Sequence, residues 1–174
     1  EFARSHHLVE GETGAMAAIR APAAEVEALA QSHGAEIGAY NSARQTVVTG
    51  SAAAVAATCQ AAEKAGLTAA PLSVKQGYHS IEMEPMLPDF RTAAEAIPLS
   101  PAKLIFVSSQ TGQVADDAIT TVDYWVDQIR HPVRWESAAQ TLAQTGCELI
   151  IEVGPRNLLS ALSAQSWPDQ PVDW

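Results

Sequence analysis

Histidine is the residue type in this sequence best suited to acid–base chemistry, because its side chain changes charge near neutral pH. His6, His7 and His33 have neighbours typical of solvated surface positions. His79 differs, since residues 75–80 follow an expected strand and precede an expected helix. Loops at strand ends are where α/β sheets place catalytic groups. His79 is therefore a candidate general base whose other ring nitrogen would be held by a backbone carbonyl.

A nucleophile for such a base cannot be identified in the chain. No serine lies in G-x-S-x-G, the sharp turn that exposes the nucleophile of α/β-hydrolases. The nearest match, residues 30–34, has Ala30 in place of the first glycine and lies at the end of an expected helix. Cys59 and Cys147 are typical of packed small apolar side chains, and neither glycine-rich phosphate-binding motif occurs. By themselves these residues indicate a soluble α/β protein with one candidate base.

Composition excludes several classes of function. With 47% apolar and 17% charged residues, the 174-residue chain can bury a core and is not expected to be disordered. Twenty acidic against ten basic residues give a net charge of −10, which disfavours nucleic-acid binding. The two cysteines lie far apart without metal-ligand spacing, so neither a disulfide nor a metal site is expected. No apolar run reaches the roughly 18 residues of a membrane span, and the start does not resemble a signal peptide; we expect a cytoplasmic protein that binds no membrane.

The elements expected in residues 14–74 alternate in a recognisable order. They are strands at 14–20, 37–43, 45–49 and 67–74, and helices at 22–33 and 52–65. Gly34 and Gly66 end the two helices, Ser51 caps the second, and residues 41–44 suit a turn. The order βαββαβ predicts a ferredoxin-like unit, in which a four-stranded antiparallel sheet carries both helices on one face.

The segment from residue 75 onwards has a different character. The expected elements are helices at 83–96, 123–129, 135–145 and 157–163 and apolar strands at 103–109 and 148–153. Strands that alternate with helices predict a parallel sheet. Two strands are too few for a self-sufficient sheet of this kind, so we expect this unit to be part of a larger one whose other strands lie elsewhere.

Three stretches of sequence together resemble a known family. They are residues 77–80 followed by 83–86, residues 124–135, and residues 151–155 followed by 158–159. In this order and spacing they resemble the acyltransferase domains of polyketide synthases, relatives of the malonyl-CoA:acyl carrier protein transacylases of fatty-acid synthesis. Residues 14–19, 39–42 and 45–50 look like the small ferredoxin-like subdomain of that family. The resemblance extends over about residues 4–163.

This resemblance implies a fold and an activity. The family has an α/β-hydrolase-like large subdomain into which the ferredoxin-like subdomain is inserted. This implies four segments in the chain: residues 1–13 lead from the large subdomain, 14–74 form the small subdomain, 75–166 form the C-terminal part of the large subdomain, and 167–174 begin a linker. A serine in G-H-S-x-G takes a malonyl group from CoA and passes it to the phosphopantetheine thiol of an acyl carrier protein. That serine is absent here, so the chain resembles the C-terminal half of the domain and is expected to be inactive alone. The chain would then be the product of cutting a longer chain ahead of residue 1, or a piece that remains associated with its N-terminal half.

The resemblance also implies roles for single residues. His79 falls on the catalytic histidine, and Gln128 on the residue whose backbone carbonyl orients it. Asn41 matches an asparagine near the acyl-CoA cleft, although a plain turn residue is an equal alternative. Arg4 is the candidate for the arginine that pairs with the malonyl carboxylate, a role that suits a planar guanidinium; the alternative is a terminal arginine without such a role.

The residues before the histidine bear on the choice of acyl group. Gln76, Gly77 and Tyr78 match neither of the common versions of the family's substrate-correlated motif. Because Tyr78 is large and nearly rigid, it is expected to occupy the space of a 2-methyl branch and so favour malonyl over methylmalonyl. No cofactor is expected beyond the CoA thioester and the carrier's phosphopantetheine. The expected partners are an acyl carrier protein, the N-terminal half of the domain and adjacent synthase domains.

Two other functions remain open on the sequence. The missing serine is compatible with a non-catalytic module that docks a carrier protein or a neighbouring synthase domain. A βαββαβ pattern also occurs in amino-acid-binding regulatory domains, but this leaves residues 75–163 unexplained. Mass spectrometry of the source protein distinguishes these alternatives, since a longer parent with G-H-S-x-G upstream would identify the enzyme.

Overall fold

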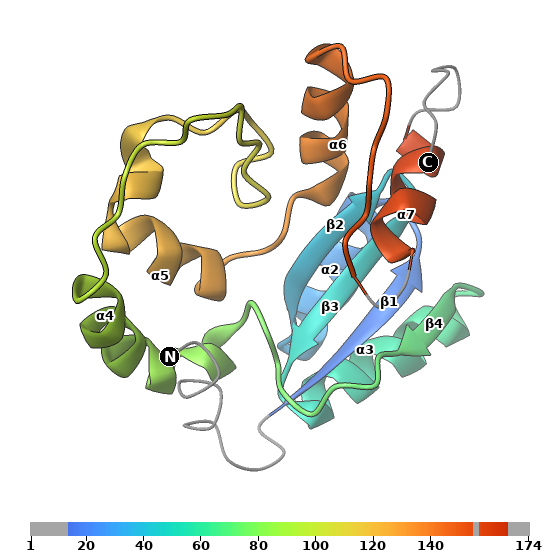
Figure 1. Ribbon diagram of the computed structural model, residues 1–174. Coiled ribbons are helices and arrows are strands. Elements are labelled where there is room, and N and C mark those ends of the chain that lie inside the picture. The colour runs from blue at the N-terminus through green and yellow to red at the C-terminus, as the bar shows by residue number, and fades with distance from the viewer. Residues whose placement is uncertain (1–13, 155–156, 167–174) are drawn as a thin grey trace.

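A computed structural model describes residues 14–154 and 157–166 of the chain. Its sheet has four strands, β1 (Ala15–Arg20), β2 (Glu36–Ser42), β3 (Gln45–Gly50) and β4 (Thr68–Pro71). They run in the order β2-β3-β1-β4, and every neighbouring pair is antiparallel (Figure 1). The sheet predicted for residues 14–74 is thereby confirmed.

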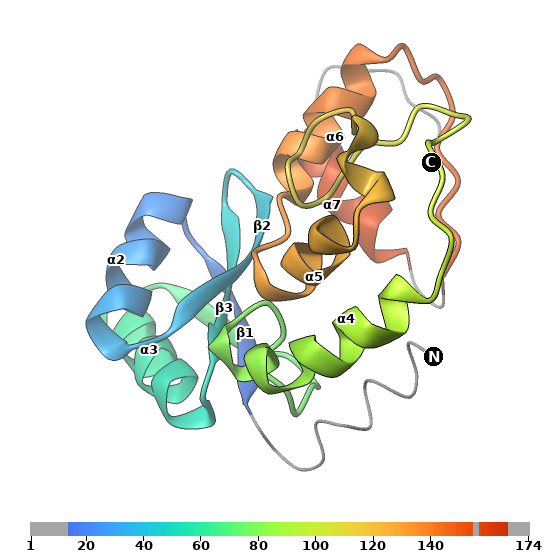
Figure 2. The same cartoon turned by 90° about the vertical axis from the view of Figure 1, so that its left-hand side faces the viewer.

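Two helices, α2 (Ala23–His33) and α3 (Ala52–Lys64), cover one face of this sheet (Figure 2). Gly34 ends α2 in the left-handed conformation at φ 73°, and the Ser51 hydroxyl accepts the Ala54 N–H at 3.2 Å to begin α3. Apolar side chains of both helices meet those of β1 and β3 in one buried cluster, made of Ala17, Ile19, Ala21, Val26, Ala30, Ala35, Val48, Val55 and Ala62. Burial of this shared face, more than helix propensity, holds the two helices to the sheet.

The second half of the chain packs on the opposite face and along one edge. Helices α6 (Trp135–Gln144) and α7 (Leu158–Ser166) lie on the other side of the sheet from α2 and α3 (Figure 2). The Val133 N–H donates to the Gly38 carbonyl at 2.9 Å, and the Tyr40 N–H donates to the Val133 carbonyl at 2.8 Å. The segment around Val133 therefore extends the sheet by a short parallel pairing at β2, a contact that the sequence did not predict.

The helix predicted over residues 83–96 is two helices in the structure. Residues Ile81–Met86 form the 3₁₀ helix η1, and α4 begins at Leu87 and runs to Glu95. Pro85 lies inside η1 and Pro88 in the first turn of α4. Since proline lacks an N–H and restricts the residue before it, one continuous α-helix across both prolines is disfavoured.

Two further helices complete the described elements. They are the 3₁₀ helix η2 (Asp117–Thr120) and α5 (Val122–Arg130), which follow each other in the chain. The Thr121 hydroxyl accepts the Tyr124 N–H at 3.3 Å and so caps α5. Across residues 14–154 and 157–166, each helix is too short or too polar to cross a bilayer.

The strands predicted at 103–109 and 148–153 do not form, which corrects the sequence analysis. Residues 106–115 instead turn back on themselves, with the Ala115 N–H donating to the Phe106 carbonyl at 2.8 Å. Both runs expose apolar side chains, and the exposed fraction reaches 85% at Leu104 and 95% at Val153. A strand of a parallel sheet forms only beside neighbouring strands that satisfy its backbone, and the described residues supply none there.

Candidate functional site

The turn that carries His79 joins β4 to η1 and has a constrained backbone. His79 has φ 61°, and no other non-glycine residue of the described segments has a positive φ. On one side, the Thr49 hydroxyl donates to the Tyr78 carbonyl at 2.7 Å. On the other side, the buried Ser80 hydroxyl donates to the Gly77 carbonyl at 2.6 Å. These bonds hold His79 in a conformation that costs a non-glycine residue about 1–3 kcal/mol.

Close backbone contacts restrict this turn further. A Cβ atom at Gly77 would lie 2.8 Å from the Gly50 carbonyl oxygen, and one at Gly14 would lie 2.4 Å from the Gly77 nitrogen. Glycine is required at both positions because the start of β1, the end of β3 and the turn touch without intervening side chains. Gly77 is therefore packed and does not loosen the residues that follow it.

The imidazole of His79 is held by the end of helix α5. Its Nδ1 lies 3.1 Å from the Gln128 carbonyl oxygen. A carbonyl only accepts hydrogen bonds, so Nδ1 carries the proton and Nε2 keeps its lone pair. The Gln128 carbonyl is available because α5 ends at Arg130, which leaves its last carbonyls without partners inside the helix. This is the backbone contact that the resemblance implied.

The surroundings of His79 favour a neutral imidazole. Partial burial lowers its pKa, while hydrogen bonds to the backbone of His131 and Gln128 act in the opposite direction. A general base must be unprotonated before it accepts a proton, and the lowered pKa keeps His79 in that form at pH 7. The helix C-terminus beside the ring carries partial negative charge, which favours the imidazolium once a proton has been taken.

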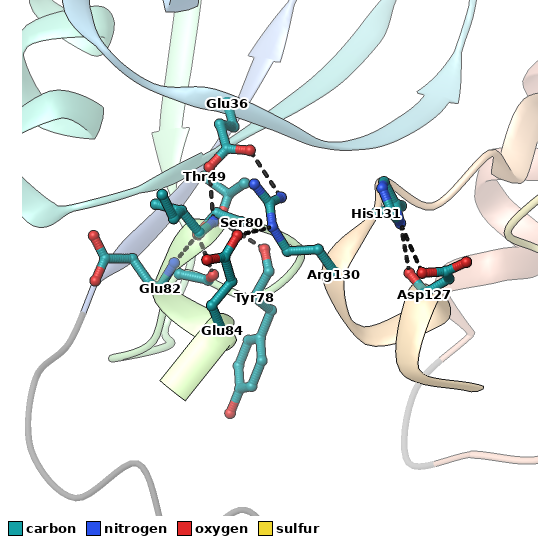
Figure 3. A network of polar contacts seen from close by, with 11 residues as sticks. Glu36, Thr49, Tyr78, Ser80, Glu82, Glu84, Asp127, Arg130 and His131 are labelled. Atoms are coloured by element: carbon teal, nitrogen blue, oxygen red, sulfur yellow. Dashed lines mark hydrogen bonds and ion pairs between the residues drawn. The ribbon is translucent and has the colours of Figure 1, made fainter. Parts of the chain in front are cut away.

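An ionic network links Glu36, Arg130 and Glu84 close to the turn (Figure 3). One Glu36 carboxylate oxygen accepts the Ile81 N–H at 2.7 Å, and the other lies 2.8 Å from Arg130 Nη1. Arg130 Nε also donates to Glu84 at 3.1 Å. This network joins β2, η1 and α5, the three elements around the turn.

Some of the residues for which the resemblance implied a role in binding the acyl group lie next to His79. The Tyr78 hydroxyl donates to Gln76 Oε1 at 3.2 Å, and its side chain packs beside Met16 and Val47 on the sheet face that α2 and α3 leave uncovered. Gln76, Gly77 and Tyr78 therefore adjoin His79. Arg4 lies outside the described residues, and its role remains a prediction.

Asn41 belongs to strand β2 and not to the turn that the sequence predicted. The turn consists of Ala43 and Arg44, because the β2–β3 pairing continues to Ser42 and Gln45. The Asn41 amide makes a long contact of 3.5 Å with Gln45 Oε1, at the end of β2 opposite to Glu36. Its placement near the acyl-CoA cleft remains a prediction.

Sequence reasoning missed five residues that build this site. They reach the turn or the end of α5 through hydrogen bonds that local patterns do not encode, and they are Glu36, Thr49, Ser80, Glu84 and Arg130. All of these except Glu36 lie inside the stretches that resemble the family, which is the one signal that could have found them. Glu36 and Thr49 come from strands more than 25 residues earlier, so only the tertiary fold shows their contact with the turn.

A second polar feature lies at the start of α7. The Glu152 carboxylate accepts the backbone N–H groups of Leu158, Leu159 and Ser160 at 2.9–3.0 Å and the Ser160 hydroxyl at 2.6 Å. The hydrogen bonds from Ser160, followed by those from the other amides, lower the pKa of Glu152 to about 2. The carboxylate thereby satisfies the free amides at the beginning of the helix.

A pH dependence of α7 follows from this capping. Because the folded-state pKa lies below the ordinary value of 4.5, the stabilising contribution of Glu152 is present above pH 4.5 and is lost as the pH falls towards 2. The protection factors of the α7 amides, which are corrected for the intrinsic exchange rate at each pH, should fall over this window, and a ¹³C NMR titration of the Glu152 carboxyl should have its midpoint near 2. In Glu152→Gln the pH dependence should disappear. A midpoint at the ordinary glutamate value would contradict the assignment.

Comparison with known proteins places these features in a family. The sequence matches the family described as acyl transferase domain over residues 3–171. It is similar to the spectinabilin polyketide synthase system protein NorB of Streptomyces orinoci, at 33% identity over 163 residues, which cover 92% of this chain and 8% of that protein.

Two solved structures share the fold of the chain. The acyltransferase domain from the second module of the salinomycin polyketide synthase has a TM-score of 0.88 and 29% identity; the match covers 97% of this chain and 40% of that one. The acyl transferase domain of SpnD, in complex with 2-(pent-4-yn-1-yl)malonyl, has a TM-score of 0.92 and 27% identity; the match covers 98% of this chain and 42% of that one. The chain thus spans less than half of each solved domain. It belongs to the acyl transferase domain family and corresponds to part of a polyketide synthase acyltransferase domain.

Proposed function

We propose that the complete domain moves a malonyl-type acyl group from CoA, through an acyl-serine, to the phosphopantetheine thiol of an acyl carrier protein. The observation that carries this proposal is the contact between His79 Nδ1 and the Gln128 carbonyl, which leaves Nε2 as the basic nitrogen. The malonyl-derived ligand of the SpnD domain supports a dicarboxylic acyl group. The serine is contributed by a segment outside this chain.

In the proposed reaction His79 acts first as a base and then as an acid in each half of the transfer. His79 Nε2 accepts the proton of the serine hydroxyl while the serine oxygen attacks the thioester carbonyl. The resulting imidazolium then protonates the leaving CoA thiolate, and the acyl-serine ester remains. In the second half the carrier thiol gives its proton to Nε2 and attacks the ester, and the serine oxygen takes that proton back. No proton is gained or lost over the cycle.

We also propose that residues 14–74 are the ferredoxin-like small subdomain and residues 75–166 the end of a hydrolase-like large one. The support is the contrast between a completed antiparallel sheet and two apolar runs that form no strands. Leu104 and Ile105 in the first run and Ile151 and Val153 in the second are 70–95% exposed. Strands from an adjoining segment would cover them and complete a parallel sheet.

Transfer between purified components tests this function. The complete domain, malonyl-CoA and a phosphopantetheinylated carrier protein should yield malonyl-carrier protein, detected as a mass increase of the intact carrier. Carrier protein without phosphopantetheine is the control, because it lacks the accepting thiol. Absence of malonyl-carrier above the enzyme-free background would contradict the proposal and favour a non-catalytic docking module.

The choice of acyl group gives a further prediction. We expect kcat/KM for malonyl-CoA to exceed that for methylmalonyl-CoA by roughly 10–200-fold, the range for discrimination by one carbon. The backbone carbonyl of Tyr78 accepts the Thr49 hydroxyl, and the Tyr78 ring packs beside Met16 and Val47, which keeps the ring beside His79 without need of its hydroxyl. Tyr78→Ser should narrow this ratio, and Tyr78→Phe, which keeps the ring, should preserve it. An unchanged ratio in Tyr78→Ser would show that Tyr78 does not line the acyl pocket.

A further inference from the structure

We propose that Glu36 and Arg130 are positioning residues that hold the imidazole of His79 in its Nδ1-protonated form against the Gln128 carbonyl. That this arrangement serves catalysis rests on the proposed function, whereas the effect of Glu36 and Arg130 on the His79 imidazole can be measured in this chain alone. Neither side chain needs to touch the substrate. Both act through the two backbone segments that meet at the His79–Gln128 hydrogen bond.

The first argument is the place of Glu36 relative to that bond. Its carboxylate accepts the N–H of Ile81, two residues after His79, and pairs with the guanidinium of Arg130, two residues after Gln128. One carboxylate is thus attached to both segments that meet at the bond. A hydrogen bond to a carbonyl depends on distance and angle, so a shift of either segment weakens it.

The second argument is the geometry of Arg130. Nη1 faces Glu36 at 2.8 Å and Nε faces Glu84 at 3.1 Å, while the side chain is only 23% exposed. Two carboxylates from different elements therefore fix the orientation of one planar group (Figure 3). Hydrogen bonds with both partners charged are the stronger kind, and a lysine offers no fixed fork. The end of α5, including the Gln128 carbonyl, is held in place by this fork.

The third argument is that Glu36 itself stands on a rigid element. Glu36 pairs with Thr49 in the β2–β3 ladder, and the Thr49 hydroxyl holds the Tyr78 carbonyl next to His79. The sheet therefore reaches the turn on both sides of His79, through Thr49 before it and Glu36 after it. The pairing of Val133 with the edge of β2 attaches the chain after α5 to the same sheet.

The chain offers a matched control for a merely structural role. Arg91 of α4 and Asp123 of α5 form another arginine–carboxylate pair, at 2.6 Å. This pair also joins α5 to the segment that follows the turn, but at the opposite end of the helix from Gln128. The Arg91–Asp123 pair is the more exposed, at 43% and 75% against 23% and 35% for Arg130 and Glu36. If ion pairs on α5 act only through general stability, the change at His79 should follow the loss of thermal stability in both Arg91→Gln and Arg130→Gln.

Nitrogen NMR of the imidazole in this 174-residue chain is the direct test. At a pH where His79 is neutral, wild type should show the Nδ1-protonated tautomer. Glu36→Gln and Arg130→Gln should raise the share of the Nε2-protonated form, Arg130→Lys should restore part of the wild-type ratio, and Arg91→Gln should leave it unchanged. Circular dichroism and thermal melts establish which variants remain folded. A wild-type tautomer ratio in folded Arg130→Gln or Glu36→Gln, or an equal change in Arg91→Gln, overturns the inference.

Kinetics of the complete domain form the second test. A base displaced by a fraction of an ångström lowers the rate without loss of substrate affinity, so Arg130→Gln should lower kcat by roughly ten-fold at unchanged KM. Arg130→Lys should recover part of this loss. An unchanged kcat overturns the positioning role. Normal transfer in His79→Ala would instead overturn the role of His79 as the base, and absence of transfer by the complete wild-type domain would overturn the proposed function. In either case the tautomer measurement would still decide whether Glu36 and Arg130 hold the imidazole.

Discussion

Replacing His79 with alanine in the complete domain is expected to lower the rate of serine acylation by about 10²–10⁴-fold, the usual contribution of a positioned general base. The loss is expected in kcat, because the imidazole acts on protons during transfer and does not bind the CoA body. The fold should persist, since His79 is only half-buried, and the left-handed φ of 61° costs an alanine no more than a modest penalty relative to histidine. Single-turnover acylation with labelled malonyl-CoA measures the effect.

The matched control for this variant is His33→Ala. His33 is an exposed histidine at the end of α2, and its Nδ1 also lies near a helix carbonyl, that of Leu29 at 2.9 Å. Loss of an imidazole there should leave the acylation rate unchanged. Wild-type acylation in a folded His79→Ala domain would end the assignment of His79 as the base.

The second large effect concerns the 174-residue chain by itself. Incubated with labelled malonyl-CoA, it is expected to acquire no covalent label, because no serine of the chain lies in the G-x-S-x-G turn. The complete domain, treated in the same way, should be labelled on a serine outside this chain. The expected difference is therefore all-or-none.

A mixture of this chain with the segment that carries the serine tests whether labelling depends on both parts. A polypeptide that carries the G-H-S-x-G serine should become labelled when mixed with this chain, and the His79→Ala form of the chain should support far less labelling. The mixture also tests whether the exposed apolar runs at 104–106 and 149–153 associate with that segment, since association should protect their amides from exchange. Stoichiometric, hydroxylamine-labile label on a serine of this chain alone would refute the prediction.

The sequence predicted the first part of the fold well because its signals are local. Gly34 ends α2, Ser51 begins α3, and the short, mostly apolar run at 14–20 marks the first strand of the sheet. Helix caps and side-chain periodicity act over a few residues, so each can be read from its neighbours. The prolines at 85 and 88 were visible too, but the change from 3₁₀ to α-helix between them depends on hydrogen bonds that the pattern does not fix.

The strands expected at 103–109 and 148–153 show the limit of local patterns. Their apolar residues have the periodicity of buried strands, yet the structure leaves Leu104 and Val153 almost fully exposed. A buried strand is stable only in the presence of its neighbours, and that condition is not contained in the segment itself.

For the site, the sequence alone determined the identity of the candidate base, since His79 lies in a loop between a strand and a helix and within a stretch that resembles a family motif. Only the tertiary structure decided its chemical state. It places the Gln128 carbonyl, 49 residues away, at 3.1 Å from Nδ1, and it brings Glu36, Thr49 and Arg130 around the turn. The tautomer, the lowered pKa and the strained backbone of His79 depend on these contacts between distant segments. Hydrogen bonds and burial act through space, so residue types determine which groups can react, and the packed fold determines in which protonation state and orientation they do so.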